Sequence, residues 1–358
     1  MSELNPNIPE TGISGLYEVI MGAAKDSDHN GAYWCKYFGE FGFSLVKQAK
    51  LSASEASKLY GVPSGCNSYR LQNGDIDSHG LVRILEWDQP IGPGVGYVPP
   101  RTIGSRIAVM RTKDIFRIND VYNGLREAGQ KWNPTQPVAD DLFGLNSAEK
   151  DFFKRPVIVR ENAVYGEYFS HIFFQRYGYY IDGYGTIGDQ SPLQTSEFTH
   201  HDFFVNASSI EEMNYMETVL GMHGEDPAKI DSDAQIGPRE VFQMAPGTGH
   251  WYRGYVSPNN ICGKLKFFVP TTRQPDKSDR QRVGELGITL HSFYSSKLDL
   301  IYDLATDHGF DCSDKIENEF GERSFVFSAL GGCTWQIIDS PNIKHQPKTK
   351  LEFTLTKD

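Results

Sequence analysis

Cysteine is scarce in this chain of 358 residues, and the few that occur are odd in number and widely scattered. They are Cys35, Cys66, Cys262, Cys312 and Cys333. Such spacing excludes a disulfide framework or a cysteine-based zinc cluster and is typical of reduced thiols. Long apolar runs are also missing. None approaches the ~18 residues of a membrane-spanning helix, and residues 1–6 lack the basic and apolar regions of a signal peptide. We therefore expect a cytoplasmic protein.

Positive charge is the next shortage. The chain carries 35 Lys and Arg against 46 Asp and Glu, which gives a formal net charge of -11. An acidic balance argues against a nucleic-acid partner or an anionic membrane surface. Hydrophobic residues make up 39% of the chain, which is enough for two cores of average size. The composition indicates a soluble enzyme with a small-molecule substrate, and it leaves a homo-oligomer open.

A strand is predicted at residues 199–205. Alternating side chains place His201 and Phe203 on one of its faces and His200 and Asp202 on the other. A divalent metal site on a sheet can be built from two histidines on separate strands and an amide side chain on a neighbouring strand. If His201 binds a metal, a second histidine is expected on a similar strand elsewhere in the chain.

One counterpart follows about ninety residues later. The strand at 199–205 precedes a helix-like stretch at 210–220 that ends at a glycine. The same order recurs in a strand at 287–293, which carries His291, and a helix at 297–307 that also ends at a glycine. The two segments are predicted to be copies of one unit.

Two fainter copies precede them, with strands at 13–21 and 105–110 and helices at 32–40 and 118–128. After each helix the chain turns β-rich, at residues 80–86, 166–174, 263–269, 324–327 and 333–338. These patterns predict four βαβββ modules and an α+β fold class. Because one such module cannot bury its own face, the modules must pair.

The four modules resemble the vicinal oxygen chelate superfamily, which includes glyoxalase I, bleomycin-resistance proteins and extradiol ring-cleaving dioxygenases. The resemblance rests on the strand of His201, the strand of His291 and the closing hairpin at 321–336, and it is sharp only in the C-terminal half. It implies two domains of curved, mostly antiparallel sheet with helices outside. Residues 1–190 would pair modules one and two as a scaffold without metal, and residues 191–358 would pair modules three and four around the active site.

The resemblance also implies a divalent metal, which could be Fe, Mn, Zn, Co or Ni, held by His201, His291 and Gln336. In the dioxygenases of this group the last ligand is a glutamate. A glutamine there removes one negative charge and favours Lewis-acid chemistry over oxygen chemistry on Fe(II). His200 is the alternative ligand if His201 does not bind the metal.

Candidate catalytic groups lie in one glycine-flanked strand and in the closing hairpin. His250, Tyr252 and Arg253 can supply an acid/base group and an anchor for an anionic oxygen, although a plain hairpin with an aromatic face explains them equally well. Glu322 is the nearest carboxylate in the closing hairpin, and it is predicted to act as a base or as the third ligand. Lys266, on the last strand of module three, can also face the site.

These features predict a metal-dependent enzyme of the lyase, isomerase or hydrolase type. It would act on a small oxygen-bearing organic substrate, which can be aromatic, by stabilising an oxyanion as it develops. Two alternatives stay open. One is an Fe(II) extradiol ring-cleaving dioxygenase, and the other is a metal-free small-molecule binding or resistance-type protein.

Overall fold

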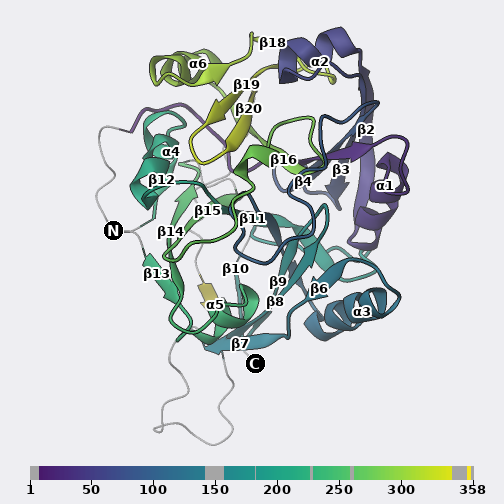
Figure 1. Cartoon of the computed structure of the whole chain (residues 1–358), viewed down its shortest axis with the longest axis vertical. Helices are drawn as coiled ribbons and strands as arrows, with labels where there is room; N and C mark the ends of the chain where they lie inside the picture. Colours follow the sequence, from purple (N-terminus) through teal and green to yellow (C-terminus); the bar gives the residue numbers. More distant parts are fainter. Residues whose placement is uncertain are drawn as a thin grey trace, which may run out of the picture.

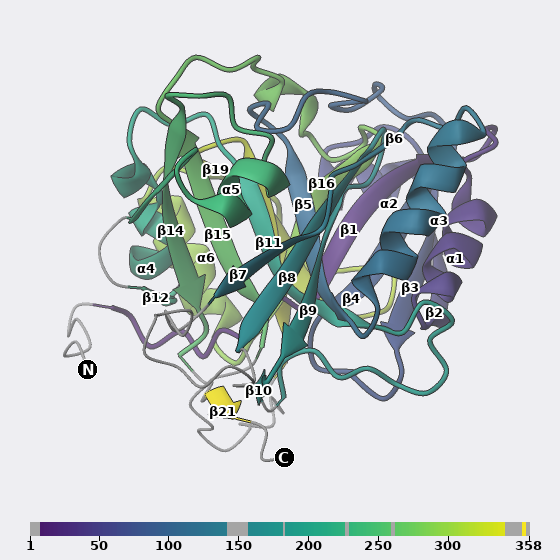
Figure 2. The same ribbon diagram turned by 90° about the horizontal axis from the view of Figure 1, so that it is seen from below.

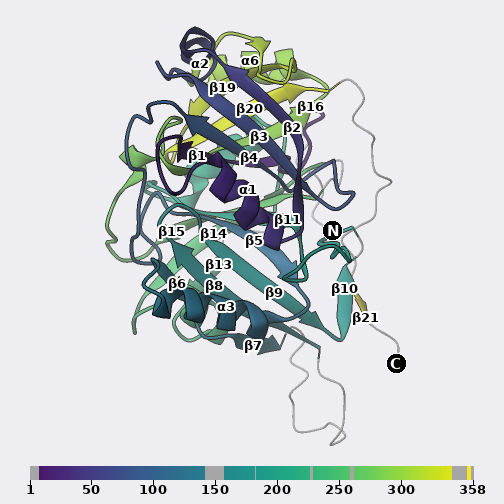
Figure 3. The same ribbon diagram turned by 90° about the vertical axis from the view of Figure 1, so that its right-hand side faces the viewer.

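The computed structural model describes residues 8–141, 157–181, 183–225, 229–258, 262–340 and 353–355. Two large sheets lie against each other. The first sheet contains β1 (Glu18–Ala24) and β16 (Gly287–Ser295), the second contains β5 (Arg106–Thr112) and β11 (Thr195–Phe204), and the first lies above the second in the view of Figure 3. Helices α1 (Gly31–Glu40) and α3 (Ile115–Glu127) lie along one side of the sheets, and α4 (Tyr215–Thr218) and α6 (Leu298–Asp307) along the other, as Figure 1 and Figure 2 show. None of the helices in this described part has the length and apolar character to span a membrane.

The four predicted modules are present, and the α+β fold class is confirmed. Module one adds to α1 the elements β1 (Glu18–Ala24), β2 (Phe43–Leu51), α2 (Ala53–Tyr60), β3 (Cys66–Asn73) and β4 (Leu81–Trp87). Module two adds to α3 the strands β5 (Arg106–Thr112), β6 (Trp132–Pro134), β7 (Val138–Asp141), β8 (Ile158–Gly166) and β9 (His171–Tyr177). Module three adds to α4 the elements β11 (Thr195–Phe204), η1 (Ile210–Asn214), β12 (His223–Gly224), β13 (Lys229–Ser232), α5 (Ile236–Val241), β14 (Gly249–Val256) and β15 (Lys264–Pro270). Module four adds to α6 the strands β16 (Gly287–Ser295), β17 (Asp311–Cys312), β18 (Ile316–Glu317), β19 (Arg323–Ala329) and β20 (Cys333–Asp339). Three short elements lie outside the modules, namely β10 (Tyr179–Ile181), η2 (Ser278–Arg280) and β21 (Phe353–Leu355).

The same strand pairing recurs in every module. The first strand pairs in parallel with the last, which joins β1 to β4, β5 to β9, β11 to β15 and β16 to β20. First strands of different modules then pair antiparallel, β1 with β16 and β5 with β11. Module one therefore shares the first sheet with module four, and module two shares the second sheet with module three.

This pairing corrects the predicted domains. Modules one and two were expected to pair within residues 1–190, and modules three and four within residues 191–358, but each sheet combines one module from either half. A boundary near residue 190 would divide the second sheet between β5 and β11, which are paired antiparallel. The physical reason is that all four first strands offer the same kind of unpaired edge, so neighbours in sequence have no advantage.

Each sheet has an inner face, turned toward the other sheet, and an outer face. The inner faces share one apolar cluster that includes Met21 and Phe293 of the first sheet and Phe203 and Phe267 of the second. Two smaller clusters lie on the outer faces, one with α2 on the first sheet and one with α5 on the second. Since side chains alternate along a strand, the central strands β1, β5, β11 and β16 each send about half of their residues into the inner core.

The outer face of the first sheet is filled by a buried ion network. Arg70 Nε donates to Glu18 Oε1 at 2.6 Å, and Arg83 lies 2.9 Å from both Glu18 Oε2 and Glu319 Oε1. All four side chains are at most 2% exposed. Two guanidinium groups thus balance two buried carboxylates, which a region this well excluded from water requires.

We expect Arg83→Met to lower the free energy of unfolding by about 3–5 kcal/mol, because it leaves two buried carboxylates without their shared cation. Lys25→Met is the control, since it removes an ion pair with Asp88 whose side chains are 46% and 39% exposed. That loss should be much smaller, because solvent screens an exposed pair. Urea denaturation of both variants makes the comparison. Equal losses would contradict the role given to the network.

Candidate active site

The three predicted metal ligands do not converge. His201 on β11 and His291 on β16 meet across the inner faces, with ring centroids 4.4 Å apart. Gln336 on β20 is aligned with Ser292 rather than with His291 in the parallel register, so its side chain lies on the outer face. There it accepts a hydrogen bond from Arg83 and donates one to Ser324. The predicted ligand triad is therefore wrong, because alternation places the glutamine on the opposite side of the sheet from the imidazoles.

The two histidines belong to the apolar core between the sheets. Phe203 packs on both rings, with centroids 4.9 Å from His201 and 4.8 Å from His291. Burial holds the pKa of both imidazoles well below the usual range. The next cause is the charge of His291 and then of Arg106 for His201, and the charge of Arg106 for His291. Both ring nitrogens of His201 lack a hydrogen-bond partner among the described residues. Beside the pair lies a guanidinium, which repels a cation, rather than a third donor.

We expect His201→Leu to leave the free energy of unfolding within about 1 kcal/mol of the wild type or to raise it, because an unpartnered buried polar ring is replaced by an apolar side chain. Phe203→Ala, on the same face of β11, should cost about 3–5 kcal/mol. Chemical denaturation measures both. A severe loss in His201→Leu would show that the imidazole has a partner that this core does not provide.

A cavity of about 440 Å³ lies on the outer face of the second sheet. Its polar lining consists mainly of Asp140, Glu161, Asp202, Asp231, Tyr252 and Lys266. We call it the acidic cavity. Phe174, Phe242 and Phe268 form its apolar wall. Its volume is within the range of small-molecule sites, and a few polar groups against an apolar wall are what such sites have in common.

Strand alternation places these side chains in the cavity. The predicted faces of β11 are confirmed, since Phe203 lies in the inner core and Phe204 in the cluster under α5. Asp202 therefore points outward, and the parallel register aligns it with Lys266 on β15. Helix α5 closes the rim, where a side chain at Gly237 would begin 2.4 Å from Asp140 Oδ2. A side chain there would displace the carboxylate of Asp140 from its place beside the helix.

The cavity holds a carboxyl group that stays protonated near neutral pH. Burial raises the pKa of Glu161 to about 8, and Asp140 and Asp202 add to the rise although Lys266 opposes it. Burial also raises the pKa of Asp202 to about 6, against the charge of Lys266. Burial lowers the pKa of Lys266, but the charges of Asp202 and then Glu161 outweigh this effect, so the pKa is raised above its ordinary value. The cavity thus combines a neutral carboxyl with a charged ammonium.

The four predicted catalytic residues are divided between three places. Tyr252 lines the acidic cavity, and His250 lies behind its wall with Nε2 2.9 Å from Oδ2 of Asp231. Arg253 points away and pairs with Glu217 at 2.9 Å. Glu322 belongs to the first sheet, where it accepts two hydrogen bonds from Arg70 at 2.8 Å. Burial alone would raise the pKa of Glu322, but the hydrogen bonds and charge of Arg70 lower it to about 2, so this carboxylate is a poor base.

Sequence reasoning missed Glu161, Asp202 and Asp231. One signal was available, because Lys264 and Lys266 alternate with apolar residues on a strand that a layered fold covers on both sides. Charges in such a strand indicate a polar site. His200, the alternative ligand, does lie on the outer face, where Tyr184 Oη is 2.9 Å from its Nδ1.

The acidic cavity does not fit the predicted metal. Throughout the described part of the chain, no group of three or more His, Cys, Asp or Glu side chains is placed to hold an ion. Within the cavity an ammonium group, that of Lys266, faces the carboxylates in the position where a cation would be needed. We therefore derive no step through a metal.

We expect the acidic cavity to make the protein less stable as pH rises. The carboxyl of Glu161 titrates near 4.5 when unfolded and near 8 when folded, so between these values the folded state binds more protons. The free energy of unfolding should fall across this window by up to about 1.4 kcal/mol per pH unit. Glu161→Gln should flatten the slope and stabilise the protein at pH 8. Urea denaturation at several pH values checks both, and identical slopes in the two proteins would contradict the raised pKa.

Comparisons with known proteins establish the fold and nothing finer. No protein-family model and no curated protein matches the sequence. Among solved structures, a putative dioxygenase from Bacillus subtilis subsp. subtilis str. 168 is similar with a TM-score of 0.52 and 11% identity, over 92% of this chain and 86% of that one. Glyoxalase I from Zea mays is similar with a TM-score of 0.51 and 9% identity, over 91% and 92%. At such identities the likeness carries no activity from those proteins to this chain.

Proposed function

We propose that this chain, which has the vicinal oxygen chelate fold, is an enzyme that moves a proton on a small oxygen-bearing organic molecule held in the acidic cavity. One observation carries the proposal. A carboxyl group with a pKa near neutrality, Glu161, shares a cavity of about 440 Å³ with the ammonium group of Lys266. Pairs of titratable groups with pKa values matched to proton transfer are a mark of catalytic sites.

The two groups have complementary tasks. The ionised form of Glu161 takes a proton from the carbon next to a carbonyl. The electron pair of that C–H bond becomes a C=C bond, and the π pair of the carbonyl moves to its oxygen. Lys266 stabilises the resulting oxyanion. Protonated Glu161 then returns the proton while the oxyanion re-forms the carbonyl. If the proton goes to the far end of a conjugated enolate, the net reaction is an isomerisation; if it goes to the same carbon after the enolate has turned its other face to the carboxyl, the net reaction is an epimerisation. A pKa near 8 suits both directions of this transfer.

The remaining lining positions the molecule. Phe174, Phe242 and Phe268 offer an apolar wall, and Tyr252 and Asp231 offer polar groups at its edge. The hydrolytic and ring-cleaving alternatives depend on a metal that the donor set of this cavity does not fit, so they find no support in the described residues.

Binding without turnover is the second candidate function. It is favoured by the carboxyl groups of the cavity, where Glu161, Asp202 and Asp231 lie together with the ammonium of Lys266 among the described lining residues. This balance suits a ligand rich in hydrogen-bond donors as well as it suits catalysis.

Proton exchange tests the proposal without knowledge of the substrate. Carbonyl compounds with an acidic C–H are incubated with the protein in D₂O, and the loss of the α-proton signal is followed by ¹H NMR. Glu161→Gln should lower the exchange rate by about 100-fold or more, and Lys266→Met should do the same by removing the oxyanion partner. Glu240→Gln is the matched control, because its side chain is 39% exposed and lies outside the cavity.

Exchange that Glu161→Gln leaves unchanged would contradict the assignment. If no compound exchanges but some bind in a way that Glu161→Gln abolishes, the second candidate replaces the first.

A further inference from the structure

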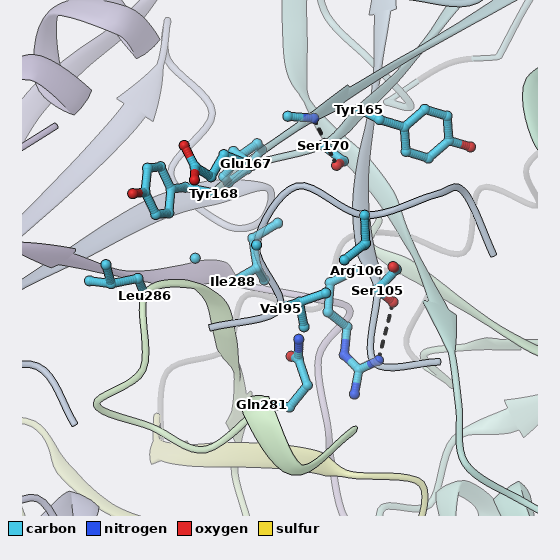
Figure 4. A pocket seen from close by; sticks show the side chains of 15 residues that line it. Val95, Ser105, Arg106, Tyr165, Glu167, Tyr168, Ser170, Gln281, Leu286 and Ile288 are labelled. Carbon is cyan, nitrogen blue, oxygen red and sulfur yellow. Dashed lines mark hydrogen bonds between the residues drawn. The ribbon is translucent and has the colours of Figure 1, made fainter. Parts of the chain in front are cut away.

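A second cavity, of about 350 Å³, lies away from the acidic cavity and shares no lining residue with it. Its walls are His29, Tyr33 and Trp34 at the start of α1, Trp132 on β6, and Glu167 and Tyr168 in the turn between β8 and β9. We call it the aromatic cavity. Figure 4 draws another pocket, which shares Glu167 and Tyr168 with the aromatic cavity, and it shows both side chains turned away from Arg106. Five aromatic rings line this one cavity, and four of them pack against one another.

The rings stand at steep angles to one another. Tyr33 and Trp34 are perpendicular, with centroids 5.2 Å apart, and Trp34 meets Tyr168 at 89° and 6.4 Å. His29 closes the ring set, 4.6 Å from Tyr33 and 5.5 Å from Tyr168. Rings in this arrangement form the sides of a cage. The negative faces of aromatic rings make such a cage attractive to a cation with an apolar surface.

A carboxylate supplies the charge. Glu167 lines the cavity with a side chain that is 25% exposed, and it lies 2.6 Å from the ammonium of Lys131. The lysine side chain is 60% exposed, and an ion pair in that setting adds little stability. An incoming cation can therefore replace Lys131 beside Glu167 at small cost.

We infer that the aromatic cavity binds a methylated ammonium ion, such as the trimethylammonium group of a small organic molecule. Methyl groups spread the positive charge over an apolar surface that aromatic faces accept, while the carboxylate of Glu167 balances the charge. Metal ions and primary ammonium groups hold their water more strongly and gain less from the rings. The site is independent of proton transfer in the acidic cavity.

Binding of choline, compared with binding of an uncharged analogue of the same shape, tests the inference. The full chain is titrated with choline and, separately, with 3,3-dimethylbutan-1-ol, which replaces the nitrogen by carbon, at constant ionic strength. Trp34 and Trp132 line the cavity, so their fluorescence reports binding. Choline should bind about tenfold more tightly than the neutral copy. Equal affinities, or no saturable change with choline, would overturn the inference.

Variants locate the site. Glu167→Gln and Tyr168→Leu should each weaken choline binding several-fold, whereas Lys131→Met should strengthen it by removing the competing cation. Trp251→Phe is the control, since this ring is 45% exposed on another strand. A weaker affinity in Lys131→Met would contradict the exchange of cations beside Glu167. Circular dichroism confirms that each variant is folded, and α-proton exchange in the acidic cavity should be unchanged in all four.

Discussion

The packing of the two sheets through their inner faces is the constraint on which the rest of the structure depends. It gives every central strand one face in an apolar core and one face outside. Neighbouring residues on β11 consequently lie in different environments. His201 becomes a neutral ring between Phe203 and His291, whereas Asp202 enters a cavity with Lys266. A shift of one residue decides between packing and chemistry.

The two outer faces treat buried charge differently. On the first sheet, Arg70 and Arg83 match the buried carboxylates of Glu18 and Glu319 at hydrogen-bonding distance, and Arg70 also pairs with the partly exposed Glu322. On the second sheet the charges around Lys266 surround an open cavity, and the carboxyl pKa values are raised rather than lowered. Carboxyl groups with raised pKa values lower the free energy of unfolding of the protein at neutral pH. Such local destabilisation is common at functional sites.

Much of the fold was predictable from the sequence, because it rests on local patterns. The repeat, the strands of His201 and His291 and the faces of β11 follow from periodicity alone. The sequence did not show which module pairs with which, because the free edges of the four first strands are equivalent. The candidate site was misplaced for a related reason. Alternation divides a strand into two faces but does not say which one is turned toward the other sheet, and the conspicuous histidines drew attention to the inner one. Glu161 gave no sign in its own strand, because its raised pKa arises first from burial in the folded chain and then from Asp140 and Asp202, which lie on other strands.

The central claim is that Glu161 is protonated at neutral pH inside the acidic cavity. A ¹³C NMR titration of glutamate carboxyl carbons measures this most directly, with Glu161→Gln to assign the signal. We expect a midpoint near the value of about 8 that burial imposes. A midpoint near 4.5, the ordinary value for a glutamate, would contradict it.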